Sequence, residues 1–434
     1  MRYLILVPDG AADVSVNGEK TPLEAAYMPN VGGLAKRGRI GLVRTIPRGV
    51  APGSDAANLA VMGYDPKTDL TGRSPLEAIS MGIELGGRDV AFRANLVTLA
   101  EGEDGGEGSG GGYAGLAIID HASGDISDAE ARVLIEYLDS ALGSGDPGNG
   151  GRLKFYAGVS YRHALIVRDG PPAKSGIGDV FADYPGYALV PPHDILERQI
   201  GLYLPDDENE RYILTLMEKS YALLKDHEVN LARVAKGLRP ANSIWIWGEG
   251  RRPQLAPIAE KYGVKGTVIS AVDLIKGIGI CAGLEPVKVE GATGTLATNF
   301  RGKGEAAVDA YKRGKDLAYI HVEAPDECSH QGSRADKITS LERIDADIVG
   351  PVLAWLEANR AETGEEFRVL IVPDHRTPVV IRTHTDEPVP YVLFDSAEAA
   401  AGHTDERHAF TEHAAAAGEA IHSGRELADA FFGS

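Results

Sequence analysis

The chain has very little cysteine and no long apolar run. Its 434 residues include only Cys281 and Cys328, which are too few for a disulfide framework and fit a reducing compartment. No run of 18 or more apolar residues occurs, so no segment is predicted to span a membrane. The short apolar run that opens the chain soon meets Asp9, which is typical of a buried strand and not of a signal peptide. The cytoplasm is therefore the expected compartment.

Positive charge is also scarce. The sequence has 44 Lys and Arg against 63 Asp and Glu, a net charge of -19 at pH 7. Nucleic acids and anionic membrane surfaces are polyanions, so neither is expected to be the main partner. A small anionic substrate is compatible with this charge, because bound divalent ions reverse the local field inside a cleft. No GxxxxGK[ST] segment is present, so the sequence shows no recognisable loop for the phosphates of ATP.

Three short apolar runs predict buried strands, at residues 3–7, 317–322 and 369–372. Each is followed closely by acidic or histidine residues. Continuous apolar runs are typical of parallel strands covered on both faces, and ligand sites in such sheets form beyond the carboxyl ends of the strands. The pattern predicts an α/β fold that delivers polar side chains to one edge of a mostly parallel sheet.

Helical periodicity is clearest over residues 335–356, where apolar side chains recur every three or four positions. They are Ile338, Leu341, Ile344, Ile348, Val352 and Trp355 or Leu356. Two glycine-rich stretches, 101–115 and 143–151, carry too few apolar groups to pack and predict mobile surface loops. Because both lie in the middle third, we predict an inserted domain at 81–244, between core segments 1–80 and 245–434.

Histidine gathers near the C-terminal end, where eight of the twelve histidines follow residue 320. Asp326 and His330 would share one face of a helix that begins near Pro325. Asp374 and His375 follow a predicted strand, as Asp9 does, and His384 comes soon after. Carboxylate with imidazole suits Mn²⁺, Zn²⁺ or Co²⁺, whereas oxygen ligands alone suit Mg²⁺ or Ca²⁺. An Asp and a His four apart more often form a simple surface pair, so the metal-site hypothesis depends on convergence of these residues in space.

Ser54 precedes an apolar helical run at residues 56–62. The ordinary interpretation is a serine that caps the helix N-terminus. A functional interpretation uses the same place: unpaired N–H groups and the positive end of the helix dipole would hold a phosphoryl group on the hydroxyl. A neighbouring metal ion would lower the pKa of that hydroxyl and make it a nucleophile.

Ten segments, in order along nearly the whole chain, carry a resemblance to a known family. They are KTPLEAA (20–26), PGSDAANLA (52–60), GYDP (63–66), TGRSPLE (71–77), GVSYRH (158–163), PPHD (191–194), WIWG (245–248), GATG (291–294), HVEAPD (321–326) and THTDEPVP (383–390). The chain resembles the archaeal-type 2,3-bisphosphoglycerate-independent phosphoglycerate mutases of the alkaline phosphatase superfamily. The resemblance implies an alkaline phosphatase-like core, its sheet flanked by helices, with an inserted α/β domain that holds the substrate.

The resemblance also implies two divalent metal ions, usually Mn²⁺, with Zn²⁺, Co²⁺ or Mg²⁺ as alternatives. One ion would take Asp9, Ser54, Asp374 and His375, and the other Asp326, His330 and His384. Ser54 would accept phosphate from 3-phosphoglycerate and return it to the 2-hydroxyl of the bound glycerate. The substrate would thus be a small phosphorylated carboxylic acid.

Cationic side chains are needed for the remaining charge of such a substrate. Lys337 is the candidate beside the metal site, with a solvated helix lysine as the alternative. Arg93, Arg162, His163 and His193 are candidates in the inserted domain, where each is equally compatible with a structural role.

The segment 120–125 departs from the family pattern, with His121 in place of a usual aromatic residue and Asp125 in place of a usual histidine. This departure leaves the identity of the substrate open. The rival functions are a homoserine kinase, as proposed for some bacterial members of the family, and a metal-dependent phosphomonoesterase, in which water replaces the bound glycerate as acceptor.

Overall fold

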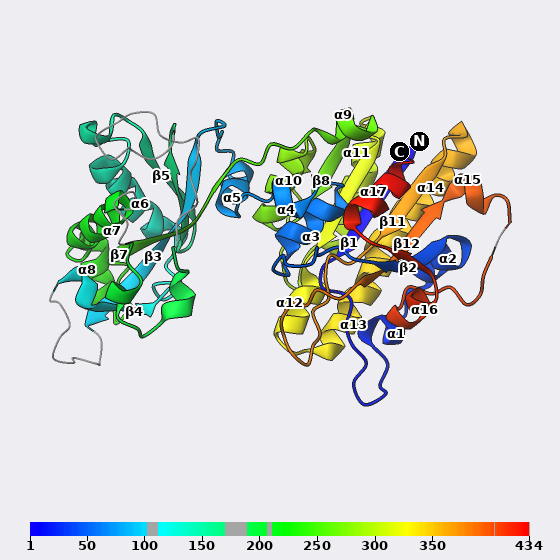
Figure 1. Ribbon diagram of the computed structural model, residues 1–434, viewed down its shortest axis with the longest axis horizontal. Helices are drawn as coiled ribbons and strands as arrows, with labels where there is room; N and C mark the ends of the chain where they lie inside the picture. The colour runs from blue at the N-terminus through cyan, green and yellow to red at the C-terminus, as the bar shows by residue number, and fades with distance from the viewer. Residues whose placement is uncertain (102–111, 170–188, 206–210, 403, 434) are drawn as a thin grey trace. The chain divides into compact units, whose positions relative to one another are not determined.

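The chain folds into two compact units in a computed structural model that describes residues 1–101, 112–169, 189–205, 211–402 and 404–433. The first unit comprises Met1–Leu70 and Pro253–Ser434, and the second comprises Thr71–Arg252. In Figure 1 the first unit combines the blue start of the chain with its yellow to red end, while the second holds most of the cyan and green part. The second unit is thus inserted into the first.

The borders of the units differ from the predicted 81 and 244. Helix α5 (Ser74–Ser80) and strand β7 (Ser243–Arg251) both belong to the second unit, whereas the sequence had placed α5 and most of β7 in the core. The physical reason is pairing: β7 is hydrogen-bonded along β3 (Val90–Glu101), and α5 packs on the same two strands.

The first unit is built on an eight-stranded sheet of order β13-β2-β12-β11-β1-β10-β8-β9. Within the described residues, every pairing in it is parallel except those of β12 with its two neighbours. The three predicted strands are β1, β10 and β11, which lie side by side at the centre, so the predicted mostly parallel sheet is confirmed. The strands are β1 (Arg2–Pro8), β2 (Arg39–Val43), β8 (Gly266–Ile269), β9 (Glu285–Val287), β10 (Leu317–Val322), β11 (Phe367–Ile371), β12 (Val389–Asp395) and β13 (Glu419–Ile421).

Helices flank this sheet, as expected for the class. The predicted helical stripe forms α13, a six-residue π-helical segment (Ile344–Val349) and α14 in succession. Its residues Leu341, Ile344, Ile348, Val352 and Leu356 are buried in the main core with the strands, which confirms the periodicity. The helices of this unit are α1 (Pro22–Ala25), α2 (Pro29–Arg37), α3 (Ser54–Val61), α4 (Pro66–Asp69), α9 (Ile258–Tyr262), α10 (Asp273–Cys281), α11 (Phe300–Lys312), α12 (Ala324–His330), α13 (Arg334–Arg343), α14 (Gly350–Thr363), α15 (Ser396–Ala399), α16 (Glu412–Ala416) and α17 (Gly424–Phe432).

The second unit has an antiparallel sheet of order β4-β3-β6-β5, with β7 pairing to β3. Its separate core centres on Trp245 and the apolar faces of α6 and α7. The remaining elements are β4 (Leu116–Asp120), β5 (Leu153–Val159), β6 (Arg162–Val167), α6 (Asp128–Leu142), α7 (Arg211–Leu224) and α8 (Glu228–Ala235), with short 3₁₀ turns at Tyr113–Gly115, Pro147–Asn149, Pro192–Ile195 and Ile200–Leu202.

The two glycine-rich stretches have different outcomes. Most of the first, residues 102–111, lies outside the described residues. The second forms a largely exposed turn between α6 and β5, where the Asn149 side chain donates to the carbonyl oxygens of Leu142 (3.1 Å) and Gly143 (2.6 Å). Among the helices that the structure describes, none has both the length and the apolar content needed to cross a membrane.

Candidate active site

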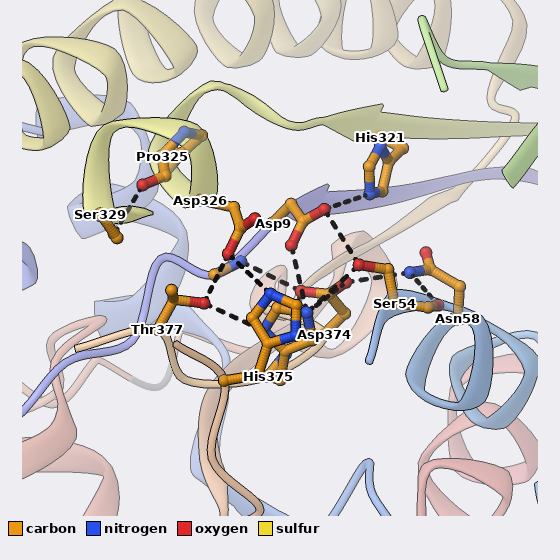
Figure 2. A network of polar contacts seen from close by, with 12 residues as sticks. Asp9, Ser54, Asn58, His321, Pro325, Asp326, Ser329, Asp374, His375 and Thr377 are labelled. Carbon is orange, nitrogen blue, oxygen red and sulfur yellow. Dashed lines mark hydrogen bonds and ion pairs between the residues drawn. The ribbon is translucent and has the colours of Figure 1, made fainter. Parts of the chain in front are cut away.

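Neighbouring strand ends position the acidic and histidine residues. Asp9 follows β1, Asp374 and His375 follow β11, and Asp326 lies in α12 directly after β10. Because β11, β1 and β10 are adjacent and parallel, their carboxyl ends meet at one edge of the sheet. Ser54 reaches the same edge from the first turn of α3, as Figure 2 shows.

The first group of donor atoms surrounds the Nε2 atom of His375. This nitrogen lies 3.2 Å from Ser54 Oγ, 3.5 Å from Asp9 Oδ1 and 3.6 Å from Asp374 Oδ2. The ligand atoms of Asp9, Asp374 and His375 lie within 4.8 Å of one another, and all three residues are buried. At this spacing the three side chains could all coordinate one cation placed between them.

The second group comprises Asp326, His330 and His384. His330 Nε2 lies 3.1 Å from Asp326 Oδ2 and 3.0 Å from His384 Nε2, while His384 Nε2 lies 3.5 Å from Asp326 Oδ1. His330 Nδ1 faces the carbonyl oxygen of Arg382 at 2.9 Å. Because a carbonyl only accepts, Nδ1 carries a hydrogen, so release of the Nε2 proton would leave the lone pair of Nε2 free for a ligand.

The two groups adjoin. The rings of His375 and His384 have centroids 4.0 Å apart, and Asp326, His375 and His384 also offer ligand atoms within 4.8 Å of one another. The structure therefore brings all seven predicted metal-ligand candidates into one cluster, with Ser54 on the side of the first group.

The electrostatics of the cluster favour a cation. Burial, together with the neighbouring charges of Asp374 and Asp326, raises the pKa of Asp9 well above its ordinary value. Its Oδ1 atom is buried and has no hydrogen-bond partner among the described residues. Burial by itself would raise the pKa of Asp326, but hydrogen bonds from His330 and His384 lower it overall. Converging carboxylates with an unpaired buried oxygen and neighbouring imidazole nitrogens fit divalent metal ions.

Ser54 is not the cap of its helix. Gly53 occupies the cap position, and Ser54 is the first residue of α3. Its hydroxyl instead lies 3.4 Å from Asp9 Oδ2 and 3.2 Å from His375 Nε2. The side chain is thus turned toward the donor cluster, where a nucleophile would be needed.

Two further buried residues, unassigned in the sequence analysis, support the cluster. His321 Nε2 lies 3.0 Å from Asp9 Oδ2, and Asn58 Nδ2 donates to Asp374 Oδ2 (3.0 Å) and to the carbonyl oxygen of Ser54 (2.8 Å). Tyr319 in turn donates to Asn58 Oδ1 at 2.5 Å. Both His321 and Asn58 lie in segments that carry the family resemblance. Their partners Asp9 and Asp374 are far away in the sequence, so the local spacing of residues does not indicate these contacts.

Lys337 is fully buried and does not lie in solvent as its alternative interpretation required. Its ammonium group donates to Asp13 Oδ2 (2.8 Å) and to the carbonyl oxygens of Thr377 (3.0 Å) and Ala12 (3.4 Å). An ammonium has three hydrogens, and these contacts account for all of them. A direct contact with substrate remains a prediction, while the observed contacts support a role in holding the loops around the site.

In the second unit, three of the four predicted substrate residues belong to one row of rings and cations. Arg93 lies over the ring of Trp247 (4.6 Å), which contacts His193 (5.5 Å). His193 contacts His121 (6.2 Å), His121 contacts Tyr161 (5.7 Å), and Arg162 lies over Tyr161 (4.5 Å). The Arg93 guanidinium is also paired with both carboxylate oxygens of Glu77, whereas Arg162 is exposed.

His163 is separated from this row. It is buried, its Nδ1 accepts a hydrogen bond from the backbone N–H of Gly158 (3.0 Å), and its Nε2 has no partner within the described part of the chain. Burial lowers the pKa of His163 from its ordinary value of 6.5 to about 3. These contacts indicate a neutral histidine inside the second unit.

The pKa of His163 predicts a pH dependence of stability. Between pH 6.5 and about 3 the unfolded histidine is protonated and the folded one is not, so the free energy of unfolding decreases as pH falls, by about 1.4 kcal/mol per unit. Above pH 6.5 the effect vanishes. Denaturant unfolding at pH 7.0, 6.0 and 5.0 should show a shallower decrease for His163→Gln, which keeps an acceptor, than for the wild type. Equal slopes for the two proteins would contradict this assignment.

A serine hydroxyl set beside two adjoining groups of carboxylate and imidazole donors, on an α/β core with an inserted unit, defines a metal-dependent phosphotransfer enzyme. The family described as 2,3-bisphosphoglycerate-independent phosphoglycerate mutase matches residues 35–230. A Geobacter sulfurreducens protein named as a probable member is 46% identical over 396 residues, with 91% of this chain and 90% of that protein covered. A Methanosarcina barkeri protein named 2,3-bisphosphoglycerate-independent phosphoglycerate mutase is 44% identical over 409 residues, with 92% of this chain and 93% of that protein covered. The chain belongs to the 2,3-bisphosphoglycerate-independent phosphoglycerate mutase family.

Solved structures agree with this fold. A protein from Pyrococcus horikoshii superposes with a TM-score of 0.76 and 25% identity, over 100% of this chain and 97% of that one. A cofactor-independent phosphoglycerate mutase from Thermoplasma acidophilum gives a TM-score of 0.62 at 24% identity, over 100% and 99%. The predicted α/β class is therefore confirmed.

Proposed function

We propose that this chain interconverts 3-phosphoglycerate and 2-phosphoglycerate through a phosphoserine at Ser54, without bisphosphoglycerate. The single observation that supports it most is the place of the Ser54 hydroxyl, 3.2 Å from His375 Nε2 and 3.4 Å from Asp9 Oδ2, inside a cluster of metal-type donors. Family membership supplies the substrate class, since the curated relatives carry this activity in their names.

Seven residues are proposed to hold two divalent metal ions. Asp9, Ser54, Asp374 and His375 would hold one, and Asp326, His330 and His384 the other. The mixed oxygen and nitrogen donors suit Mn²⁺, Zn²⁺ or Co²⁺. Among these the family resemblance favours Mn²⁺, with Mg²⁺ as a further alternative. When bound, such ions supply positive charge that stabilises a serine alkoxide and the oxygens of the transferring phosphoryl group.

The chain's own residues account for the transfer. Ser54 Oγ loses its proton and forms a bond to phosphorus as the bond to the 3-oxygen of the substrate breaks, and the 3-oxygen takes up a proton. The 2-hydroxyl then loses its proton and forms a bond to phosphorus as the Ser54 bond breaks, and Ser54 Oγ takes up a proton again. No net water is consumed. Ser54 begins α3, so the positive end of the helix dipole also faces the phosphoryl group. Asn58 contributes by fixing the Ser54 backbone and Asp374 together.

The second unit is proposed to hold the glycerate while the phosphoryl group resides on Ser54. Arg162 is the strongest candidate for its carboxylate, because it is exposed and a guanidinium can grip two oxygens. Arg93 and His193 lie in the same row of contacts, although Arg93 would have to share its guanidinium with Glu77. His163 is the weakest candidate, since it is buried and its Nδ1 already accepts a hydrogen bond from the Gly158 N–H.

The test offers the metal-loaded protein 3-phosphoglycerate, homoserine with ATP, or a simple phosphomonoester. The expected result is 2-phosphoglycerate formed without added bisphosphoglycerate, with little inorganic phosphate released. Isotopically labelled free glycerate should stay out of the product, because the original glycerate remains bound. Rapid homoserine phosphorylation with unchanged 3-phosphoglycerate would establish the kinase instead, and stoichiometric phosphate release would establish the phosphatase.

A further inference from the structure

Thr377 is a fully buried residue whose hydroxyl touches one candidate ligand from each donor group. Its Oγ1 donates to Asp326 Oδ1 at 2.6 Å and lies 3.1 Å from His375 Nδ1. Figure 2 shows the side chain between these two residues, on the side away from Ser54.

The hydrogens of this contact can be assigned. An ionised carboxylate has only acceptors, so the one hydrogen of the Thr377 hydroxyl points to Asp326. Toward His375 the hydroxyl can then only accept, and the hydrogen between them belongs to Nδ1 of the imidazole. His375 Nε2 therefore keeps its lone pair, directed at Ser54, Asp9 and Asp374.

We propose that Thr377 is a positioning residue that sets the tautomer of His375 and the orientation of Asp326 together, and so couples the two cation sites. The inference rests on the ligand set of the proposed function. Second-layer groups that orient a ligating histidine or carboxylate strengthen metal binding. A single hydroxyl that does so for both ions makes the two binding events depend on each other.

The threonine itself is firmly held. Its N–H donates to the carbonyl oxygen of Ala12 (3.2 Å), and its own carbonyl accepts from Lys337 Nζ (3.0 Å). Gly10 has φ of +58°, and a Cβ added there would lie 2.5 Å from both Thr377 Oγ1 and Asp326 Oδ1. A glycine is thus required for the chain to pass so close to the hydroxyl. The buried Lys337 accordingly acts on the site through the Thr377 backbone.

The test compares Thr377→Val, which keeps the shape but loses both hydrogen bonds, with Thr377→Ser, which keeps the hydroxyl. Mn²⁺ is titrated into each full-length, metal-stripped protein, and binding is followed by calorimetry and by the electron paramagnetic resonance signal of coupled Mn²⁺ pairs. We expect Thr377→Val to bind both ions about 10- to 100-fold more weakly and to lose the coupled signal. Thr377→Ser should restore both properties.

The matched control is Thr267→Val. Thr267 is an equally buried threonine whose hydroxyl has no hydrogen-bond partner among the described residues, so its replacement should leave Mn²⁺ affinity unchanged. A merely structural role for Thr377 would change unfolding without changing affinity. If Thr377→Val does not fold, Thr377→Ala removes the same hydroxyl with a smaller side chain. Its Mn²⁺ affinity is then compared with that of Thr377→Ser in the same way.

Two variants separate failure of this inference from failure of the ligand set. Asp326→Asn and His375→Ala should each lose a metal ion if the ligand set is right. Wild-type Mn²⁺ binding by Thr377→Val, beside loss in those two variants, would overturn the role of Thr377 alone. Wild-type binding by Asp326→Asn and His375→Ala would overturn the ligand set, and the inference with it.

Discussion

Ser54→Ala is expected to lower the rate of 3-phosphoglycerate conversion by about 10⁴-fold or more, the range seen when a covalent nucleophile is removed. The reason is that no other hydroxyl in the described network faces His375 Nε2 and Asp9 together. The measurement is a coupled assay for 2-phosphoglycerate. In parallel, rapid quenching followed by intact-mass analysis should detect one added phosphoryl group on the wild type and none on the variant.

The matched control for this prediction is Ser15→Ala. Ser15 is exposed and donates to the carbonyl oxygen of Glu19, four positions along the chain, at 2.8 Å. It should keep wild-type activity and a wild-type melting temperature. Substantial activity in Ser54→Ala, with the protein folded and metal-loaded, would mean that phosphate passes between the two oxygens without a phosphoserine.

Removal of divalent metal is expected to abolish activity and to lower stability. The buried carboxylates of Asp9, Asp374 and Asp326 lie close enough to raise the pKa of Asp9 by burial and mutual repulsion, and a bound cation relieves that repulsion. A ligand that binds only the folded state at 100 times its dissociation constant raises the free energy of unfolding by about 2.7 kcal/mol per site. Thermal unfolding of stripped and Mn²⁺-loaded protein measures the difference.

Two controls accompany the metal experiment. Restoring Mn²⁺ after chelation should recover activity and melting temperature, which excludes irreversible damage. Asp374→Asn should show a smaller Mn²⁺-dependent rise in melting temperature than the wild type, because one proposed ligand has lost its charge. Full activity in protein from which metal has been removed below detection would contradict the two-metal proposal.

The central strands and the long helical stripe could be predicted because each is encoded locally. Residues 3–7, 317–322 and 369–372 are continuous apolar runs. Short runs of this kind are typical of parallel strands that are covered on both faces of a sheet. The stripe from Leu341 to Leu356 repeats with the helical period and packs on that sheet. The unit borders were displaced because β7 pairs with β3, some 150 positions earlier, and no local pattern records that pairing.

The sequence predicted the metal-ligand candidates of the site but not the residues that support them. The residue types that ligate metals are few, so Asp326, His330 and His384 could be singled out from composition and spacing. Asn58 and Thr377 could not, because amides and hydroxyls are common and their roles depend on which atoms they meet. The same holds for Lys337, whose partner Asp13 lies 324 positions away in the chain.

By itself, the sequence determined which chemical groups the protein has, the periodicities that become strands and helices, and the motifs that mark its family. Only the tertiary structure decided which of those groups meet. Ser54 lies 45 positions from Asp9 and 321 from His375, yet hydrogen bonding and metal coordination act over about 2 to 3 Å. Contacts of that length between distant segments exist only after the sheet has aligned its strand ends.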